Sequence, residues 1–262
     1  MLRRILCVFT SIIVALGSLA QERPSFISQK YDLFTTDVQE NIYGWTNDRL
    51  DQYSSQGELL YHYSNPSMGY ISQVDASIPT KIMVYYEESN SILLLNNKLA
   101  PIGNPINLFE LGILNPVMVC MFGINRLACY NETNQQLILI DLDLKQTNVI
   151  NCQFDTEFHP QHIIADHNFE QLVLSDSAAG LAFYDRFGSF QKWIPVQGIQ
   201  HLQLRNNILF FMKDNTIYGN DLSTLWSPNM IIGINGMASF SKVLSNLYYI
   251  DSNGFIEKIS LR

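Results

Sequence analysis

Asn246–Arg262 reads NLYYIDSNGFIEKISLR, and this stretch decides the fold. Two apolar runs, Leu247–Ile250 and Phe255–Leu261, flank the turn residues Asp251–Gly254, which is the pattern of a β-hairpin. A two-stranded hairpin is marginally stable alone, and its second strand presents an open edge. A strand from elsewhere in the chain is therefore expected to cover that edge.

The same pattern recurs along the sequence in units of roughly forty residues. Each unit has a first strand, a second strand that ends in an Asp/Asn-rich turn, a third strand and usually a fourth apolar run. The second strands begin at Ile42, Ile82, Leu127, Leu172, Ile208 and Leu247. Four strands in a unit of this length are typical of a propeller blade, so the sequence predicts an all-β fold, a six-bladed β-propeller.

One blade of this propeller lacks its fourth strand, and one segment belongs to no blade. The last unit stops after Phe255–Leu261, while RPSFISQK (Arg23–Lys30) is left unassigned. We predict that Arg23–Lys30 pairs beside Phe255–Leu261 as the outer strand of the last blade. Residues 21–262 would then form a single propeller closed by an N-terminal strand, and the open edge would disappear.

Residues 1–20 have the pattern of a secretory signal peptide. Arg3 and Arg4 precede the apolar run Ile5–Leu16, and the small residues that follow predict cleavage after Ala20. A membrane anchor, the alternative, would need about 20 apolar residues. We therefore expect export, followed by a periplasmic protein that does not itself span the membrane.

The composition argues against several partners. The chain has 24 acidic and 16 basic residues and a formal net charge of −8. Because nucleic acid and anionic lipid surfaces attract basic proteins, an acidic chain is a poor partner for either. We therefore expect no binding to nucleic acid.

Two cysteines lie in the expected hairpin VMVCMFGINRLACYNE (Val117–Glu132). A two-residue turn at Ile124-Asn125 would place Cys120 opposite Cys129 at a non-hydrogen-bonded pair, where side chains approach most closely. A cross-strand disulfide is one interpretation in an oxidising compartment. Two buried free thiols that pack as small apolar side chains are the other.

Two histidines occupy similar positions in neighbouring blades. His162 and His201 lie on first strands, which line a propeller's channel, and Asp166 or His159 could complete a metal site. Zinc normally takes three or four protein ligands, and two aligned imidazoles are more often hydrogen-bonded channel residues. We therefore predict neither metal nor cofactor. Because the sequence also lacks a Gly-x-Ser-x-Gly elbow, a phosphate loop and a His-Glu-x-x-His run, we name no catalytic residues.

Two apolar stretches are candidates for a partner surface. Ile106–Val117 is the expected outer strand and link after the second blade, and Leu225–Met237 is the corresponding region after the fifth. Apolar side chains exposed there would indicate a binding partner, although about half of them could instead pack between blades. The candidate partner-binding residues are Leu108, Phe109, Leu111, Trp226, Met230 and Ile231.

Within Val74–Leu144 the sequence has a D-x-S-x-P-x-K-I opening, an apolar strand, an L-x-N-x-L hairpin and an I-N-L strand. These positions are Asp75, Ser77, Pro79, Lys81, Ile82, Leu95, Asn97, Leu99 and Ile106–Leu108. The motif covers about a quarter of the chain and resembles that of small exported β-propellers from Bacteroidota. The expected cleavage site, Ala20-Gln21, also has a sequence context that is usual in that phylum. Cys129 departs from the family, which tends to place Trp there.

The resemblance implies a non-enzymatic, protein-binding propeller. It extends to the periplasmic plug subunit of the type-nine secretion translocon, which would occlude a large outer-membrane pore. The expected partner is thus an outer-membrane secretion pore or its accessory subunits, with this protein as a plug or scaffold at the periphery of the outer membrane. The alternative is a small-ligand or metal-dependent hydrolase of the lactonase type that uses the channel mouth near His162 and His201.

Overall fold

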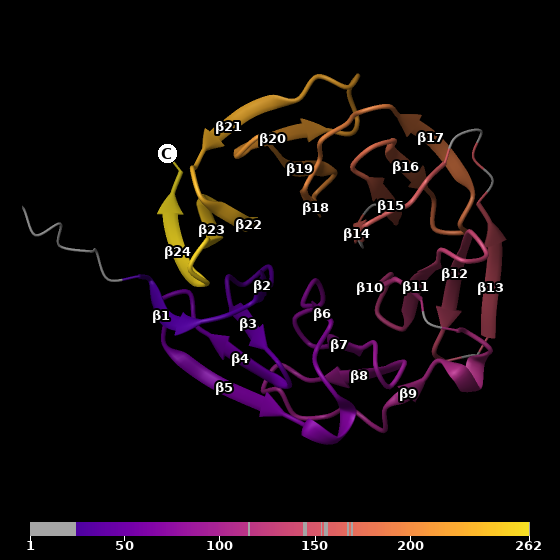
Figure 1. Cartoon of the computed structure of the whole chain (residues 1–262), viewed down its shortest axis with the longest axis horizontal. Coiled ribbons are helices and arrows are strands. Elements are labelled where there is room, and N and C mark those ends of the chain that lie inside the picture. Colours follow the sequence, from indigo (N-terminus) through magenta and orange to yellow (C-terminus); the bar gives the residue numbers. More distant parts are fainter. Residues whose placement is uncertain are drawn as a thin grey trace, which may run out of the picture.

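The computed structural model describes residues 25–261 apart from 115, 144, 145, 153, 155, 156, 167 and 169. This part of the chain forms six antiparallel sheets of four strands each, arranged in a ring (Figure 1). The structure is therefore a six-bladed β-propeller, as predicted. The proposed signal peptide, residues 1–20, lies outside the described residues.

Each blade runs outward from an inner strand beside the axis to an outer strand at the rim (Figure 1). In order from the first blade to the sixth, the inner strands are β2 (Leu33–Thr36), β6 (Gln73–Asp75), β10 (Met118–Met121), β14 (His162–Asp166), β18 (His201–Arg205) and β22 (Met237–Val243). The second strands are β3 (Ile42–Thr46), β7 (Ile82–Tyr86), β11 (Arg126–Asn131), β15 (Gln171–Asp176), β19 (Ile208–Lys213) and β23 (Asn246–Asp251). The third strands are β4 (Arg49–Tyr53), β8 (Ser91–Leu95), β12 (Gln136–Asp141), β16 (Gly180–Tyr184), β20 (Thr216–Asp221) and β24 (Phe255–Ser260). The outer strands are β5 (Leu59–Ser64), β9 (Ile106–Asn107), β13 (Gln146–Asn151), β17 (Phe190–Ile194), β21 (Asn229–Gly233) and β1 (Ile27–Lys30).

The core lies between the blades. Six clusters of buried apolar side chains each join one blade to the next around the ring. Strands that pack on both faces are buried along their whole length, as β7, β8 and β16 are. This explains why the second and third strands are continuous apolar runs in the sequence rather than alternating ones.

The ring is closed as the last hairpin requires. Strand β1 pairs antiparallel with β24, with Ile27 opposite Ile256. Ile27 is only 3 % exposed and packs in the cluster that joins the sixth blade to the first. The next residue after the strand, Tyr31, donates its N–H to the Gly254 carbonyl (2.9 Å) and its hydroxyl to the Asp51 carboxylate (2.7 Å). The closing strand is thus fixed to both blades that it joins.

The structure describes two helices, both short 3-10 turns, at Pro66–Met68 and Phe109–Leu111. Within the described ranges, no helix combines the length and apolarity that a bilayer-crossing helix would need.

The expected pairing of Cys120 with Cys129 is wrong. Cys120 lies opposite Ala128 instead, because the turn has three residues rather than two, and Phe122 N–H donates to the Arg126 carbonyl across it (2.8 Å). A shift of one residue turns a side chain to the other face of the sheet. The two thiols therefore lie in different clusters, and both are free and buried.

We expect a reducing agent to leave the melting temperature unchanged. Burial raises the pKa of Cys129 to about 12 and that of Cys120 as well, so neither thiol is reactive at neutral pH. A thiol reagent should modify these cysteines only after denaturation. Losing a real disulfide would instead cost about 2–5 kcal/mol, so a clear drop in melting temperature on reduction would contradict the free-thiol state.

Candidate functional site

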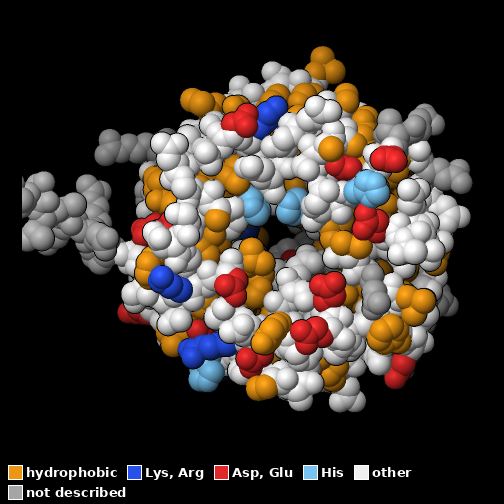
Figure 2. All heavy atoms as spheres, viewed as in Figure 1, with side chains coloured by type: hydrophobic (Ala, Val, Ile, Leu, Met, Phe, Trp, Pro, Cys, Tyr) orange, Lys and Arg blue, Asp and Glu red, His pale blue; other side chains and the backbone are white. Residues whose placement is uncertain are grey.

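The channel along the axis widens into a cavity at each end. The cavity where the inner strands begin measures about 370 Å³ and is lined by His162 and His201; we call this the histidine end. The cavity where the inner strands finish measures about 440 Å³ and is lined by Arg205; we call this the arginine end. Figure 2 shows the histidine end, with pale-blue imidazole groups beside the central opening.

The two histidines meet at the histidine end, as their matching positions predict. Their ring centroids are 5.6 Å apart, and the His162 Nε2–H donates to the Gln200 carbonyl (2.7 Å). Burial lowers the pKa of His162, and burial together with repulsion from His162 lowers the pKa of His201 to about 4. Both rings are therefore neutral at pH 7.

The two expected third ligands do not join this pair. His159 lies with its Nδ1 2.7 Å from a Glu132 carboxylate oxygen and is exposed. Asp166 lies at the other end of β14 from His162 and lines the arginine-end cavity. Among the residues that the structure describes, no three or more His, Cys, Asp or Glu side chains gather as ligands of one metal ion.

We expect the protein to lose stability as the pH falls below about 6.5, because unfolded His201 then takes up a proton. Folded His201 does so only near its pKa of about 4, so the unfolded state gains the advantage between these values. The loss attributable to His201 is about 1–2 kcal/mol at pH 5. Urea unfolding at pH 7 and pH 5 measures it, and His201→Gln should reduce the difference.

His62→Gln, on the exposed outer strand β5, is the matched control and should leave the pH dependence unchanged. If His201→Gln and the wild type lose the same free energy between pH 7 and pH 5, the histidine assignment is wrong.

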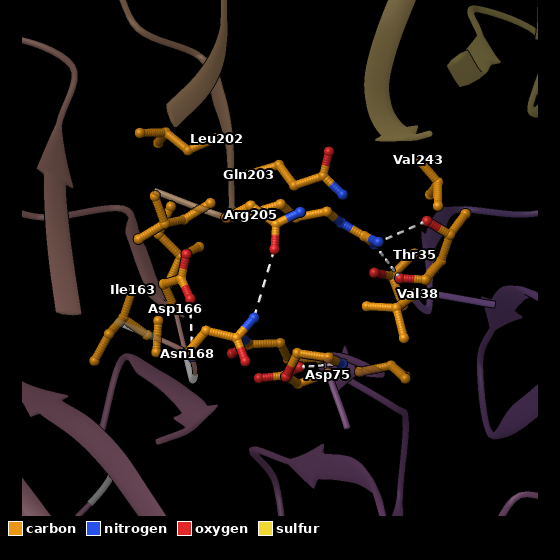
Figure 3. Close-up of a pocket in the computed structure, with 18 of the residues that line it drawn as sticks. Thr35, Val38, Asp75, Ile163, Asp166, Asn168, Leu202, Gln203, Arg205 and Val243 are labelled. Atoms are coloured by element: carbon orange, nitrogen blue, oxygen red, sulfur yellow. Dashed lines mark hydrogen bonds between the residues drawn. The ribbon is translucent and has the colours of Figure 1, made fainter. Parts of the chain in front are cut away.

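At the arginine end, the side chain of Arg205 reaches from the fifth blade to the first. The Arg205 guanidinium donates from Nη2 to the Thr36 carbonyl (2.7 Å) and from Nη1 to the Asp37 carbonyl (3.2 Å), so the contact passes the sixth blade (Figure 3). Arg205 makes no ion pair with any described carboxylate. Burial lowers its pKa to about 10, and the charges of Asp37 and Asp75 only partly offset this. No motif in the sequence singles out Arg205.

The carboxylates of the inner strands connect neighbouring blades. Asp75 Oδ2 accepts the Met121 N–H of the next blade (2.8 Å), and Asp166 Oδ2 accepts the Asn207 N–H in the same way (2.8 Å). An inner strand is the edge of its sheet, so the N–H groups on its unpaired side, such as that of Met121, need partners from outside the sheet. An acidic residue at the end of an expected inner strand was the available sequence signal for these contacts.

Leu108 is not a docking residue, because it is fully buried. The outer strand of the second blade is only Ile106–Asn107, and the chain then enters the turn Phe109–Leu111. The Leu108 N–H donates to the Asn90 carbonyl (3.0 Å), which holds the side chain in the core between the second and third blades.

The other five predicted partner-binding residues divide by exposure. Phe109 and Met230 are exposed, the latter by 69 %. Half-buried side chains are found at Leu111, Trp226 and Ile231. Trp226 stacks on Phe211 with ring centroids 5.5 Å apart, so its ring packs against the core. Phe109 and Met230 are therefore the two exposed members of the predicted set.

Both ends of the propeller expose apolar and acidic side chains: Tyr70, Leu114 and Val117 are exposed at the histidine end, and Asp143 and Asp221 are exposed at the arginine end. Turns between second and third strands lie at the histidine end, and each contains or adjoins an acidic residue. These residues are Asp48, Glu87, Glu132, Asp176, Asp214 and Asp251. At the arginine end, exposed apolar side chains lie in turns at Val38, Ile124, Phe187, Leu225 and Leu244. We call this second set the apolar tips.

No family model and no curated protein matches the chain. Among solved structures, it is similar to a chain from a nidogen/laminin complex, with a TM-score of 0.63 at 10 % identity, over 84 % of this chain and 89 % of that one. The likeness is one of fold. A streptogramin B lyase gives a TM-score of 0.57 at 12 % identity, over 92 % of this chain and 85 % of that one. PorZ, an essential surface component of the type-IX secretion system of Porphyromonas gingivalis, gives 0.52 at 11 % identity, over 90 % of this chain but 34 % of PorZ.

Proposed function

We propose that this chain is a non-enzymatic, protein-binding propeller of the periplasm that attaches to an outer-membrane protein-secretion machine as a plug or scaffold subunit. The observation that carries the proposal is the set of apolar tips, because it contains the most exposed large apolar side chains of the described residues. Leu225 is 90 % exposed and Leu244 75 % exposed. Large apolar side chains concentrated on one face mark a surface that a partner covers.

Leu225 and Leu244 both lie in turns at the arginine end, and their exposure gives the direction of docking. The arginine end faces the partner. The fold likeness to PorZ, named as a component of the type-IX secretion system, agrees with a secretion partner. The N-terminal pattern of residues 1–20 supports export to the periplasm.

The proposal is tested by affinity purification of a C-terminally tagged chain from the cell envelope. The wild type should recover an outer-membrane secretion pore or its accessory subunits. Leu225→Lys combined with Leu244→Lys should abolish that recovery, because two charges would enter an apolar interface. Phe109→Lys with Met230→Lys is the matched control, since these exposed apolar residues lie outside the apolar tips.

Recovery of the chain with no membrane partner would contradict the proposed function. Loss of the partner in the Phe109/Met230 variant alone would keep the function and overturn the docking face.

The hydrolase alternative predicts a different result. A metal-dependent enzyme at the histidine end would carry stoichiometric metal, and both His162→Ala and His201→Ala would lose it. Metal analysis of the purified wild type and the two variants separates the alternatives, and we expect no stoichiometric metal in any of them.

A further inference from the structure

The cavity at the arginine end contains a cation with unused binding capacity. A guanidinium carries five N–H donors, and Arg205 uses some of them on Thr36 and Asp37. Its Nε–H donates to no described residue, and no described carboxylate pairs with it. Asp37 and Asp75 offset the cost of burying this cation only in part, and an anion in contact with the guanidinium would offset it further.

The cavity has the size and lining of a small-molecule site. Its volume of about 440 Å³ falls within the range of about 300–1,000 Å³ that is usual for such sites. Apolar side chains form part of the wall, and Figure 3 shows Ile163, Leu202 and Val243 around the same cavity as Arg205. Val38 and Leu244 also line it and are exposed. The ligand should therefore carry an apolar group beside its anion.

The acidic side chains limit the charge of that anion. Asp75 and Asp166 line the same cavity as Arg205 (Figure 3). Asp75 and Asp166 together outweigh the single charge of Arg205, so a dianion such as phosphate would be repelled, whereas an amino acid carries no net charge and can place its carboxylate at Arg205. Asp75 Oδ1 accepts the Ser77 N–H and Oδ2 accepts the Met121 N–H, both at 2.8 Å. Because a carboxylate can accept about four hydrogen bonds, Asp75 can also accept an ammonium group.

We propose that this cavity binds the α-carboxylate of an amino acid with an apolar side chain, with Arg205 holding the carboxylate. The amino acid is either free or the C-terminal residue of a peptide. Asp75 favours the free amino acid, whose ammonium group it would hold. This inference does not depend on the proposed secretion partner.

The test is isothermal titration calorimetry with three probes that differ by one group. Leucine carries both the carboxylate and the ammonium, N-acetyl-leucine carries only the carboxylate, and N-acetyl-leucinamide carries neither. Leucine and N-acetyl-leucine should bind, and the amide should not. Tighter binding of leucine identifies the free amino acid as the ligand, and equal or tighter binding of N-acetyl-leucine identifies a peptide C-terminus. Equal binding of the amide, or no binding of any probe, would overturn the proposal.

Two kinds of variant locate the site. Arg205→Met should abolish binding, and circular dichroism would show whether it still folds. Val38→Asp tests the site without touching Arg205, because Val38 is exposed at the rim of the cavity. Its new carboxylate should weaken leucine binding by at least about tenfold through repulsion and competition for Arg205. Val38→Asn has nearly the same shape as Val38→Asp without the charge, so it should bind leucine clearly more tightly than Val38→Asp does; equal affinity in both Val38 variants would place the ligand elsewhere.

Discussion

A chain without residues 25–30 should fail to form a closed, monomeric propeller. Its last blade would have three strands, and β24 would expose the N–H and C=O groups that now pair with β1. An unpaired strand of this kind is a template for association with other chains. Size-exclusion chromatography with light scattering should therefore show oligomers and aggregate, and the melting transition should broaden and fall.

A point variant makes the same test without a deletion. Ile27→Asp places a carboxylate among the side chains that join the sixth blade to the first, where Ile27 is 3 % exposed. We expect a loss of about 4 kcal/mol or more, because the charge has no partner there. Gln29→Asp adds the same group at an exposed position of the same strand and is the control. If the truncated chain and Ile27→Asp were as heat-resistant and monomeric as the wild type, ring closure by β1 would be disproved.

Gly44→Ala should cost about 3 kcal/mol, the second largest effect that we expect. A Cβ atom at Gly44 would lie 2.7 Å from the Cγ and Cδ2 atoms of Tyr31. The ring cannot move aside freely, because the Tyr31 hydroxyl bonds to Asp51 and Tyr53. Either the ring is displaced with its hydrogen bonds or the strand shifts. Urea unfolding measures the loss.

A double-mutant cycle separates this clash from other effects of the substitution. In a Tyr31→Ala background the cost of Gly44→Ala should largely vanish, because the obstructing ring is absent. Gly233→Ala is the control, since its nearest neighbour, Thr216 Oγ1, would be 3.5 Å away. An unchanged cost in the Tyr31→Ala background would refute the contact as the cause.

The closed ring could be predicted because an unsatisfied strand edge is visible in sequence. The hairpin at Asn246–Arg262 needed a neighbour, and Arg23–Lys30 was the segment without a blade. The approach of His162 to His201 was predictable for a similar reason. Matching positions in consecutive repeats become neighbours in space when the repeats stack.

Register and long-range contacts were harder to predict. The hairpin that contains Cys120 and Cys129 admits a turn of two or three residues, and this choice alone decides which side chains face each other. Leu108 was expected at the surface because its strand was taken to be longer than the structure shows. Arg205 contacts residues two blades away in the ring, at Thr36 and Asp37, and no local pattern reports such a contact.

The pairing of β1 with β24 also determines the order in which the protein can be completed. During synthesis β1 emerges long before β24, yet each needs the other. The closing contact has one of the largest sequence separations in the fold, so we expect it to form late and slowly. Until then the nascent chain exposes an open strand edge and uncovered apolar faces. These surfaces favour aggregation, and chaperones can bind them before the ring closes.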